Sequence, residues 1–391
     1  MVYRGRRFFP IACICSFFLG FESGGFQYSL LKIATELNIS GVQNGILVAA
    51  QYSAIMVMPV LFGKIADRVG KRRILFFFCL VFCLGCLGIS VFPGYVFALG
   101  SVFVIGAGYS VCESMSAAIL ADEGSGKSGQ LLSYAQCLFS LGAVLSPQYL
   151  RFVERAAGWS WESLFMTCGA AFFGVALVLR PCSHGDDFLK KTVSMAKDSG
   201  GKQRIKGRFL LLIFAMFVYG GMEVGISYYI DTYLRSVLQM AEQTADVISM
   251  FWLLMIPLRF INGMLYKYKR AILPACLFTA SLALVYLGAG PPNPGGGWLA
   301  FALLGGCLGP VWPILMSTGA ESDRKNSGLL TGMLSVGCGC GAVLLPILLG
   351  YSVDHWGIRN GFLVTGVLSV CGGLAGAGYF RSKATEVHSE K

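Results

Sequence analysis

Twelve apolar stretches follow one another along the chain, and they limit its fold more than any other feature. A helix of about 20 apolar residues spans the hydrocarbon core of a bilayer. Only 13% of the residues are charged, against about 25% in soluble proteins, which excludes a water-facing globule, a disordered tail and a nucleic-acid binder. We therefore expect an all-α membrane protein with twelve transmembrane helices. The stretches lie at 8–33, 42–63, 74–92, 95–120, 130–150, 161–180, 209–234, 245–265, 270–289, 298–319, 328–350 and 361–380.

The placement of the basic residues predicts the orientation. Twelve spans put both termini on one side, and 25 of the 31 Lys and Arg residues lie in segments on that side. Arg259 lies inside a predicted span, and the other five are Lys32, Arg151, Arg155, Arg235 and Arg359. Because segments rich in Lys and Arg stay in the cytoplasm, we expect a multi-pass protein of the cell membrane with both termini cytoplasmic. The net charge of +11 then reflects topology rather than a nucleic-acid partner.

An internal repeat divides the chain into two halves. Residues 128–147 (SGQLLSYAQCLFSLGAVLSP) and 327–346 (SGLLTGMLSVGCGCGAVLLP) share eight identities in twenty positions at an offset of 199. At an offset of 201, a second correspondence pairs Gly20, Glu22, Gly24 and Tyr28 with Gly221, Glu223, Gly225 and Tyr229. We expect two pseudo-symmetric six-helix bundles at 1–180 and 209–391, joined by a cytoplasmic linker at 181–208. This is the layout of transporters whose halves rock about a midplane site.

The loop between the second and third stretches carries the most specific motif, GKIADRVGKRR from Gly63 to Arg73. Gly63 permits a close helix approach and Gly70 a tight turn, while Asp67 can cap a neighbouring helix. The segment resembles the signature loop of the major facilitator superfamily, G-x-x-x-D-[RK]-x-G-[RK]-[RK]-[RK]. That resemblance implies the fold of this family and a conformational latch that holds the two halves in the outward-open state. The latch residues are Gly63, Asp67, Arg68, Gly70 and Arg72.

Three further segments resemble the fucose-permease-like branch of sugar–proton symporters. They are F-V-Y-G-G-M-E at 217–223, Trp252 with Arg259 and Gly263, and G-x-x-G-P-V-W-P at 306–313. The predicted span 95–120 lacks the arginine motif of drug–proton antiporters. Gly142-x-x-x-Ser146-Pro147 is similar to another antiporter motif, but its following glycine pair is absent. The resemblance therefore favours symport and leaves efflux as an alternative.

Three acids lie well inside predicted spans, away from their ends, and we expect them to couple transport to protons: Glu22, Glu223 and Glu113. A charged residue at the centre of a bilayer costs about 2.5–3.5 kcal/mol on insertion scales, so such residues usually face a water-filled cavity. The alternative is a protonated structural acid bonded to a neighbouring helix. Arg259 is the one basic residue placed well inside a span, away from its ends, and it can pair with an acid or bind substrate. Sodium in place of protons stays open.

Hydrogen-bonding and flat side chains in the spans are candidates for substrate contact, although each can equally serve packing. The predicted substrate-binding residues are Gln27, Tyr28, Gln51, Gln136, Tyr228, Arg259, Asn262 and Trp312. The fourteen cysteines, with Cys83-x-x-Cys86 among them, lie almost wholly in apolar runs and lack secreted-disulfide spacing. We therefore expect no metal, cofactor or disulfide.

These features predict a secondary active transporter that moves a small polar solute, with a sugar as one candidate, by proton-coupled alternating access. The alternatives are proton-driven efflux of cationic or amphipathic compounds, and a non-transporting sensor or scaffold. An enzyme is not expected, because no nucleophile–base pair or metal cluster emerges. The expected partners are a small-molecule substrate, protons and the lipid bilayer, and we expect a monomer.

Overall fold

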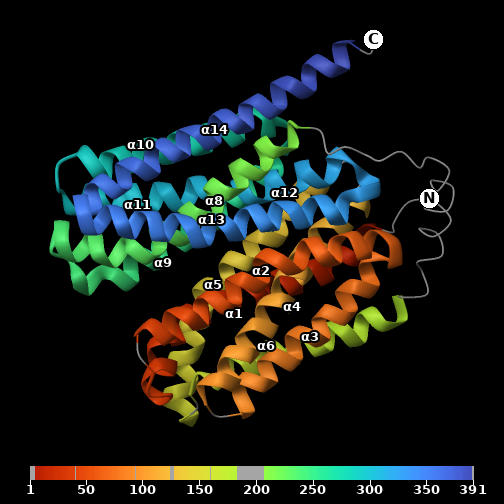
Figure 1. Cartoon of the computed structure of the whole chain (residues 1–391), viewed down its shortest axis with the longest axis horizontal. Helices are drawn as coiled ribbons and strands as arrows, with labels where there is room; N and C mark the ends of the chain where they lie inside the picture. The colour runs from red at the N-terminus through yellow and green to blue at the C-terminus, as the bar shows by residue number, and fades with distance from the viewer. Residues whose placement is uncertain are drawn as a thin grey trace. The chain divides into compact units, whose positions relative to one another are not determined.

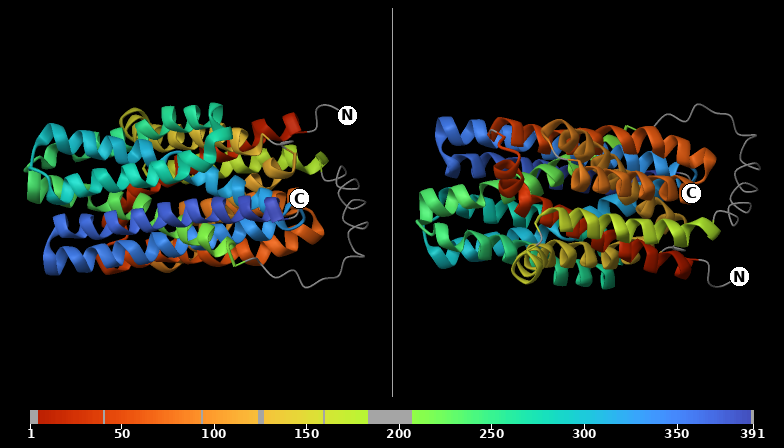
Figure 2. Two further views of the ribbon diagram at one scale, coloured as in Figure 1. Left: turned by 90° about the horizontal axis from the view of Figure 1, so that it is seen from above. Right: turned by 90° about the horizontal axis from the view of Figure 1, so that it is seen from below.

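The computed structural model describes residues 5–39, 41–92, 94–123, 127–158, 160–182 and 207–389, and these segments are almost entirely helical (Figures 1 and 2). The predicted linker at 181–208 lies almost wholly outside the described residues. Each of the twelve predicted stretches falls on a helix or a consecutive helix pair. An apolar stretch folds this way in lipid because a helix satisfies its backbone hydrogen bonds internally.

Among the described residues, six helices form the first half of the chain. They are α1 (Gly5–Glu36), α2 (Gly41–Val69), α3 (Lys71–Val91), α4 (Tyr95–Glu123), α5 (Ser128–Ala157) and α6 (Glu162–Cys182).

Between residues 207 and 389, seven α-helices form the second half, because one predicted stretch is divided in two. They are α8 (Phe209–Tyr233), α9 (Thr244–Met264), α10 (Lys269–Ala289), α11 (Pro294–Leu308), α12 (Val311–Ser322), α13 (Ser327–Trp356) and α14 (Ile358–Ser389). A short π-helical turn (Leu234–Leu238) extends α8.

Within the described residues, eleven segments are long and apolar enough to cross a membrane, with α11 and α12 counted as one. The twelfth segment is α5, which spans 30 residues but carries several Gln, Ser and Tyr side chains along its first turns. The predicted all-α membrane fold with twelve spans is therefore confirmed, and α5 is its most polar member.

The chain divides into two compact units. The first comprises Met1–Arg204 together with Gly319–Val336, so the end of α12 and the first turns of α13 belong to it. The second comprises Ile205–Thr318 and Gly337–Lys391. In the first unit α1 packs on α5, and α3 packs on α4 and α6. In the second unit α14 packs on α8 and α10, while α9 packs on α11.

The inner face of α1 follows a seven-residue period. Its buried side chains recur every three or four residues, which is the spacing of one helix face. The most deeply buried of them are Phe8, Ala12, Cys15, Leu19, Glu22, Phe26, Ser29 and Ile33. Glu22 therefore lies on the packed face of α1 and within the interior of the first unit.

The repeated glycines make the same helix crossing in each unit. A Cβ on Gly142 of α5 would overlap the carbonyl oxygen of Phe17 on α1. A Cβ on Gly341 of α13 would overlap the carbonyl oxygen of Phe217 on α8. Small residues permit such close backbone contact where lipid provides no hydrophobic drive for helix association. The GAVL-x-P repeat therefore encodes the α1–α5 and α8–α13 crossings.

These crossings also correct the alignment of the first helix in each half. Gly20 meets the backbone of Phe139, and Gly220 meets that of Cys338, so Gly20 corresponds to Gly220 rather than to Gly221. The true offset between α1 and α8 is thus 200, and the offset of 201 was wrong by one residue.

The corrected register separates the two acids that the sequence had paired. In it, Glu22 corresponds to Met222, and Glu223 corresponds to Ser23. One residue is a rotation of about 100° around a helix. Glu22 and Glu223 therefore occupy different faces of their helices and cannot be symmetry equivalents.

We predict that Gly142→Leu and Gly341→Leu each destabilise the protein, because the added side chain would displace a backbone rather than a mobile side chain. Overpacking typically costs about 1–3 kcal/mol. Thermal unfolding of the detergent-solubilised protein measures the loss. Gly100→Leu and Gly174→Leu are matched controls, since a Cβ at either helical glycine meets no atom within 4 Å. An equal loss of stability in the controls would contradict the close-crossing explanation.

Candidate functional site

A carboxylate, a phenol and a guanidinium come together inside the second unit. Tyr219 lies one turn before Glu223 on α8, and its hydroxyl donates to Glu223 Oε1 at 2.5 Å. Arg259 extends from α9, with Nη2 at 3.9 Å from the same oxygen. The Arg259 side chain is 1% exposed and that of Glu223 is 17% exposed. The centre thus holds one acid and one base, both within helices that span the membrane.

The guanidinium has a second acceptor at the break between α11 and α12. Arg259 Nε donates to the carbonyl oxygen of Gly309 at 3.1 Å. In a regular helix that oxygen would accept from the backbone N–H four residues later, but the residue there is Pro313, which has none. The proline therefore creates the acceptor that Arg259 uses.

Two other predicted residues lie close in sequence to this centre. Asn262, one turn after Arg259 on α9, is buried, and so is Trp312, which stands between Pro310 and Pro313. The side chain of Tyr228 lies outside the described residues.

A different acid lies in the interior of the first unit. Glu22 is fully buried, and Gln51 of α2 donates from Nε2 to its Oε1 at 3.0 Å. Among the described residues, its Oε2 is buried with no hydrogen-bond partner. The thiols of Cys86 on α3 and Cys168 on α6 lie in the surroundings of this carboxyl. Glu22 thus faces thiols and an amide, whereas Glu223 faces a cation.

The remaining predicted residues of the first unit occupy several places. Glu113 is half-buried in the middle of α4, and Gln136 is buried on α5. Gln27 and Tyr28 are half-buried on α1 beyond Glu22. The Tyr28 ring lies 5.8 Å from the Arg151 guanidinium and 5.7 Å from the Lys32 ammonium, which are basic residues near the ends of α5 and α1.

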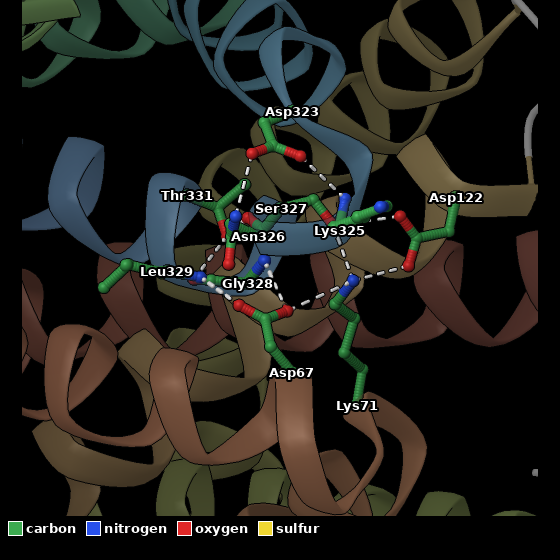
Figure 3. A network of polar contacts seen from close by, with 10 residues as sticks. All are labelled: Asp67, Lys71, Asp122, Asp323, Lys325, Asn326, Ser327, Gly328, Leu329 and Thr331. Carbon is green, nitrogen blue, oxygen red and sulfur yellow. Dashed lines mark hydrogen bonds and ion pairs between the residues drawn. The ribbon is translucent and has the colours of Figure 1, made fainter. Parts of the chain in front are cut away.

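The motif loop caps the first turn of α13 (Figure 3). Asp67 Oδ1 accepts from the N–H of Gly328 at 3.0 Å, and Oδ2 accepts from the N–H of Leu329 at 2.9 Å. The first N–H groups of a helix have no intrahelical partner, and a carboxylate there is also favoured by the helix dipole. The predicted capping role of Asp67 is thereby confirmed, and its helix is α13.

Glycines of the motif allow this approach. A Cβ on Gly63 would collide with the backbone of Gly328, so α2 and α13 cross in direct backbone contact. Gly70 has φ of 111°, a value that side chains disfavour, and it forms the turn between α2 and α3. Arg72 forms an ion pair with Glu123 at 2.5 Å, and Arg68 is exposed.

A lysine links the capped helix to α4. Lys71 Nζ lies 2.5 Å from both Asp122 Oδ2 and Ser327 Oγ, and 3.4 Å from Asp67. Ser327 in turn donates to Asp122 Oδ1 at 2.9 Å (Figure 3). The serine–carboxylate hydrogen bond occurs twice, once for each copy of the repeat. Ser128, which corresponds to Ser327, donates to Glu321, which corresponds to Asp122. We name Asp67, Lys71, Asp122 and Ser327 the α13 cap network.

Sequence analysis missed several members of these clusters. Asp122 and Glu321 correspond at the offset of 199, as do Ser128 and Ser327, and that correspondence was the available signal. Tyr219 was visible in its motif, and its spacing of four from Glu223 places both on one face. The contacts that join these residues link segments about 200 residues apart, and the sequence of one segment does not indicate its partner in the other.

The thirteen cysteines whose side chains the structure describes are free thiols. The same residues contain no group of three or more His, Cys, Asp or Glu side chains arranged to hold a metal ion.

Comparison with known proteins places these features in a family. Residues 12–327 match the model of the Major Facilitator Superfamily. A D-xylose transporter of Levilactobacillus brevis is 24% identical over 166 residues, which cover 41% of this chain and 36% of the relative. The multidrug resistance protein MdtG of Klebsiella pneumoniae is 41% identical over 70 residues, 18% of this chain and 16% of the relative. The chain thus spans well under half of the length of these curated relatives.

Solved structures show the same fold. The fucose:proton symporter FucP of E. coli has a TM-score of 0.73 at 18% identity, covering 95% of this chain and 98% of that chain. The proton:xylose symporter XylE, bound to 6-bromo-6-deoxy-D-glucose, has a TM-score of 0.75 at 14% identity, with 94% of each chain covered. At these identities the likeness concerns the fold alone.

We predict that Asp67→Ala destabilises the start of α13, because two N–H groups lose their acceptor. The loss of a helix cap costs about 0.5–2 kcal/mol. Hydrogen exchange of the amides at 327–333 should accelerate, and the melting temperature should fall. Lys64→Ala, at an exposed position of the same helix outside the latch residues, is the matched control and should change neither. Unchanged exchange at 327–333 in Asp67→Ala would rule out the cap as a stabilising contact.

Proposed function

The chain belongs to the major facilitator superfamily, and we propose that it is a secondary active transporter moving a small polar solute by proton-coupled alternating access. A sugar is the first substrate class to test, because the xylose transporter and the two symporters above carry that description. The chain spans only part of its curated relatives, so their substrates guide the choice of test compounds and nothing more.

One observation carries the proposal: the buried Glu223–Arg259 pair in the second unit. The guanidinium lies 3.9 Å from the carboxyl, close enough to interact and too far for a direct hydrogen bond. A carboxyl that gains a proton there no longer attracts the buried guanidinium beside it, and weakening a buried ion pair is energetically costly. Protonation of Glu223 thus changes the forces on α9, as a coupling site requires.

We assign the coupling proton to Glu223 before Glu22 and Glu113. Among the described residues, the surroundings of Glu22 include the amide of Gln51 and the thiols of Cys86 and Cys168 but no paired basic side chain. A buried carboxyl in such surroundings is best accommodated in its neutral form. Glu22 then acts as a hydrogen-bonding acid within the first unit, and Glu113 stays a candidate for coupling.

The substrate contacts are part of the same proposal. Arg259, Asn262 and Trp312 are the first candidates, because a guanidinium, an amide and an indole together offer donors and a flat apolar face to a polyol. The other candidates are Gln27, Tyr28, Gln51, Gln136 and Tyr228.

We further propose that the motif loop is a conformational latch. Its support is the α13 cap network, in which Asp67 and Lys71 hold the first turn of a helix that continues into the second unit. Gly63, Arg68, Gly70 and Arg72 complete the proposed latch. We also propose that both termini are cytoplasmic, because most Lys and Arg residues lie in segments on the side of the termini. We propose that the protein is a monomer.

Proton-driven efflux is the second candidate function. It is favoured by the 70-residue match to a multidrug resistance protein. The two functions differ in direction: overexpression of an efflux protein lowers the accumulation of a cationic dye in energised cells, whereas a solute symporter leaves it unchanged.

We predict that adding a transported solute to de-energised cells alkalinises the external medium, because symport carries protons inward with the solute. A pH electrode records the change while candidate sugars are added one at a time. A protonophore should collapse solute accumulation. Accumulation that withstands the protonophore but requires sodium would reassign the coupling ion.

We predict that Glu223→Gln and Glu22→Gln behave differently. Glutamine has nearly the shape of a neutral carboxylic acid, so Glu22→Gln should preserve solute-driven proton uptake. Glu223→Gln removes the charge that faces Arg259 and should reduce that uptake to background. The same pH recording compares the two variants at matched expression. Loss of coupling in Glu22→Gln with coupling intact in Glu223→Gln would reverse the assignment.

A further inference from the structure

The helices α1 and α5 stay in contact beyond their glycine crossing, and polar side chains meet there. Gly24 of α1 meets the backbone of Ala143 on α5. Residues four apart lie on one face of a helix, so Tyr28 and Lys32 continue this line toward the last turns of α5. The Lys32 ammonium accordingly forms an ion pair with Glu154 of α5 at 2.5 Å.

Arg151 of α5 belongs to the same group of side chains. Its guanidinium lies 5.8 Å from the centre of the Tyr28 ring, and the Lys32 ammonium lies 5.7 Å from that ring. Both distances allow cation–π attraction, which positions a cation without taking up its N–H donors. Arg151 is exposed, and among the described residues it has neither a hydrogen-bond acceptor nor a carboxylate partner. Its charge and its donors are therefore available to a ligand.

Two neutral side chains beside Arg151 also offer hydrogen bonds. Tyr28 is half-buried, and Gln148 is exposed one turn before Arg151 on α5. Within the part of the chain that the structure describes, neither the Tyr28 hydroxyl nor the Gln148 amide has a hydrogen-bond partner. A guanidinium, a hydroxyl and an amide are donors suited to the oxygens of a carboxylate or a phosphate.

The second unit keeps the helix crossing but not this pair of side chains on its repeated helix. At the offset of 199 between α5 and α13, Gln148 and Arg151 correspond to Ile347 and Gly350. The crossing therefore requires no polar or basic side chain at these positions. Packing does not account for Gln148 and Arg151, and a ligand does.

The group lies at the opposite end of α5 from Ser128 and the α13 cap network. The proposed orientation puts this end outside, where five of the 31 Lys and Arg residues of the chain lie. Lys32 has the carboxylate of Glu154, and Arg359 donates to two backbone carbonyls of the second unit. Arg151 instead presents its donors to solutes on that side.

We propose that Arg151, Tyr28 and Gln148 form a recognition site for the anionic group of a small solute, a carboxylate or a phosphate. The Arg151 guanidinium binds two of its oxygens in a fork, and Tyr28 and Gln148 donate to lone pairs that the fork leaves open. The proposal deepens the proposed function, on which it rests for its role in transport. It narrows the solute to an organic anion, such as a sugar acid or a sugar phosphate.

The test measures binding to the full-length protein in detergent, as the rise of its melting temperature. The probes are D-glucuronate, D-gluconate and D-glucose 6-phosphate, with D-glucose as their neutral match. At least one anionic probe should bind, and Arg151→Gln should weaken its binding about tenfold or more, because a hydrogen bond to a charged group is worth about that factor. The effect of D-glucose should not depend on Arg151. The proposal is overturned if no anionic probe shows binding that depends on Arg151.

Arg155→Gln is the matched control. Arg155 is exposed one turn after Arg151 on α5, so the variant removes the same charge but has no described contact with Tyr28. It should weaken binding far less, because salt screens exposed charges over about 8 Å. Equal losses in Arg151→Gln and Arg155→Gln would indicate a diffuse surface charge and would refute the site.

Two conservative variants test the proposed hydrogen bonds. Arg151→Lys keeps the charge without the fork, and Tyr28→Phe keeps the ring without the hydroxyl. Each should weaken the binding of the anionic probe, because each removes a donor that the site uses. Unchanged affinity in both variants would contradict the proposed geometry.

An anionic lipid headgroup offers the same phosphate oxygens, and nanodiscs distinguish it from a soluble solute. Melting temperatures of the wild type and Arg151→Gln are compared in phosphatidylcholine alone and with phosphatidylglycerol added. The difference between the two proteins should be the same in both lipids. A difference that requires phosphatidylglycerol, with no effect of the soluble probes, would assign the site to lipid and overturn the proposal.

The outcomes separate this inference from the proposed function. If every solute that drives proton uptake does so equally in the wild type and Arg151→Gln, the inference fails and the transport proposal stands. If an anionic probe binds through Arg151 but no solute moves protons, the recognition site stands and the transport proposal fails.

Discussion

Lipid offers no hydrogen bonds, and this one constraint shapes both the helices and the places where they are interrupted. Regular helices satisfy their own backbone, but helix ends and prolines leave groups that need partners. Asp67 supplies the acceptor for two N–H groups at the start of α13. Arg259 supplies the donor for the Gly309 carbonyl that Pro313 leaves open. The charged residues of this chain are few, and each of these two supplies a hydrogen-bond partner to a backbone group of another helix.

The two units share a backbone plan and differ in chemistry. Gly142 and Gly341 make the same crossing, and Gly106 and Gly305 repeat a second one, against the carbonyls of Gln51 and Phe251. Those crossings tolerate no side chain, so duplication has preserved them. Side chains elsewhere were free to diverge. Hence Gln51, the partner of Glu22, has a phenylalanine at the equivalent position, and the cation that faces Glu223 belongs to the second unit alone.

Part of the candidate site was predictable because its physical reasons are local. Gly70 needs a positive φ for a turn between two adjacent helices, and Asp67 in a glycine-flanked loop is a natural cap. Neither argument names the helix that is capped. The partners of Lys71 lie 51 and 256 residues away, and a loop motif carries no information about them. The register of Glu22 and Glu223 was misaligned for a related reason. Similar residues align well at a sequence offset of 201, and only the contacts of Gly20 and Gly220 with their neighbouring backbones showed that the offset is 200.

By itself, the sequence determined that this chain is a twelve-helix membrane protein of a duplicated plan, because span length, charge scarcity and glycine repeats act through local or periodic rules. It also placed Glu223, Arg259 and the G-P-V-W-P break inside the membrane. Only the tertiary structure decided that these three meet, with one guanidinium between a carboxyl and an orphaned carbonyl. The reason is that a hydrogen bond between helices depends on their rotation and crossing, which close packing of all the helices sets together.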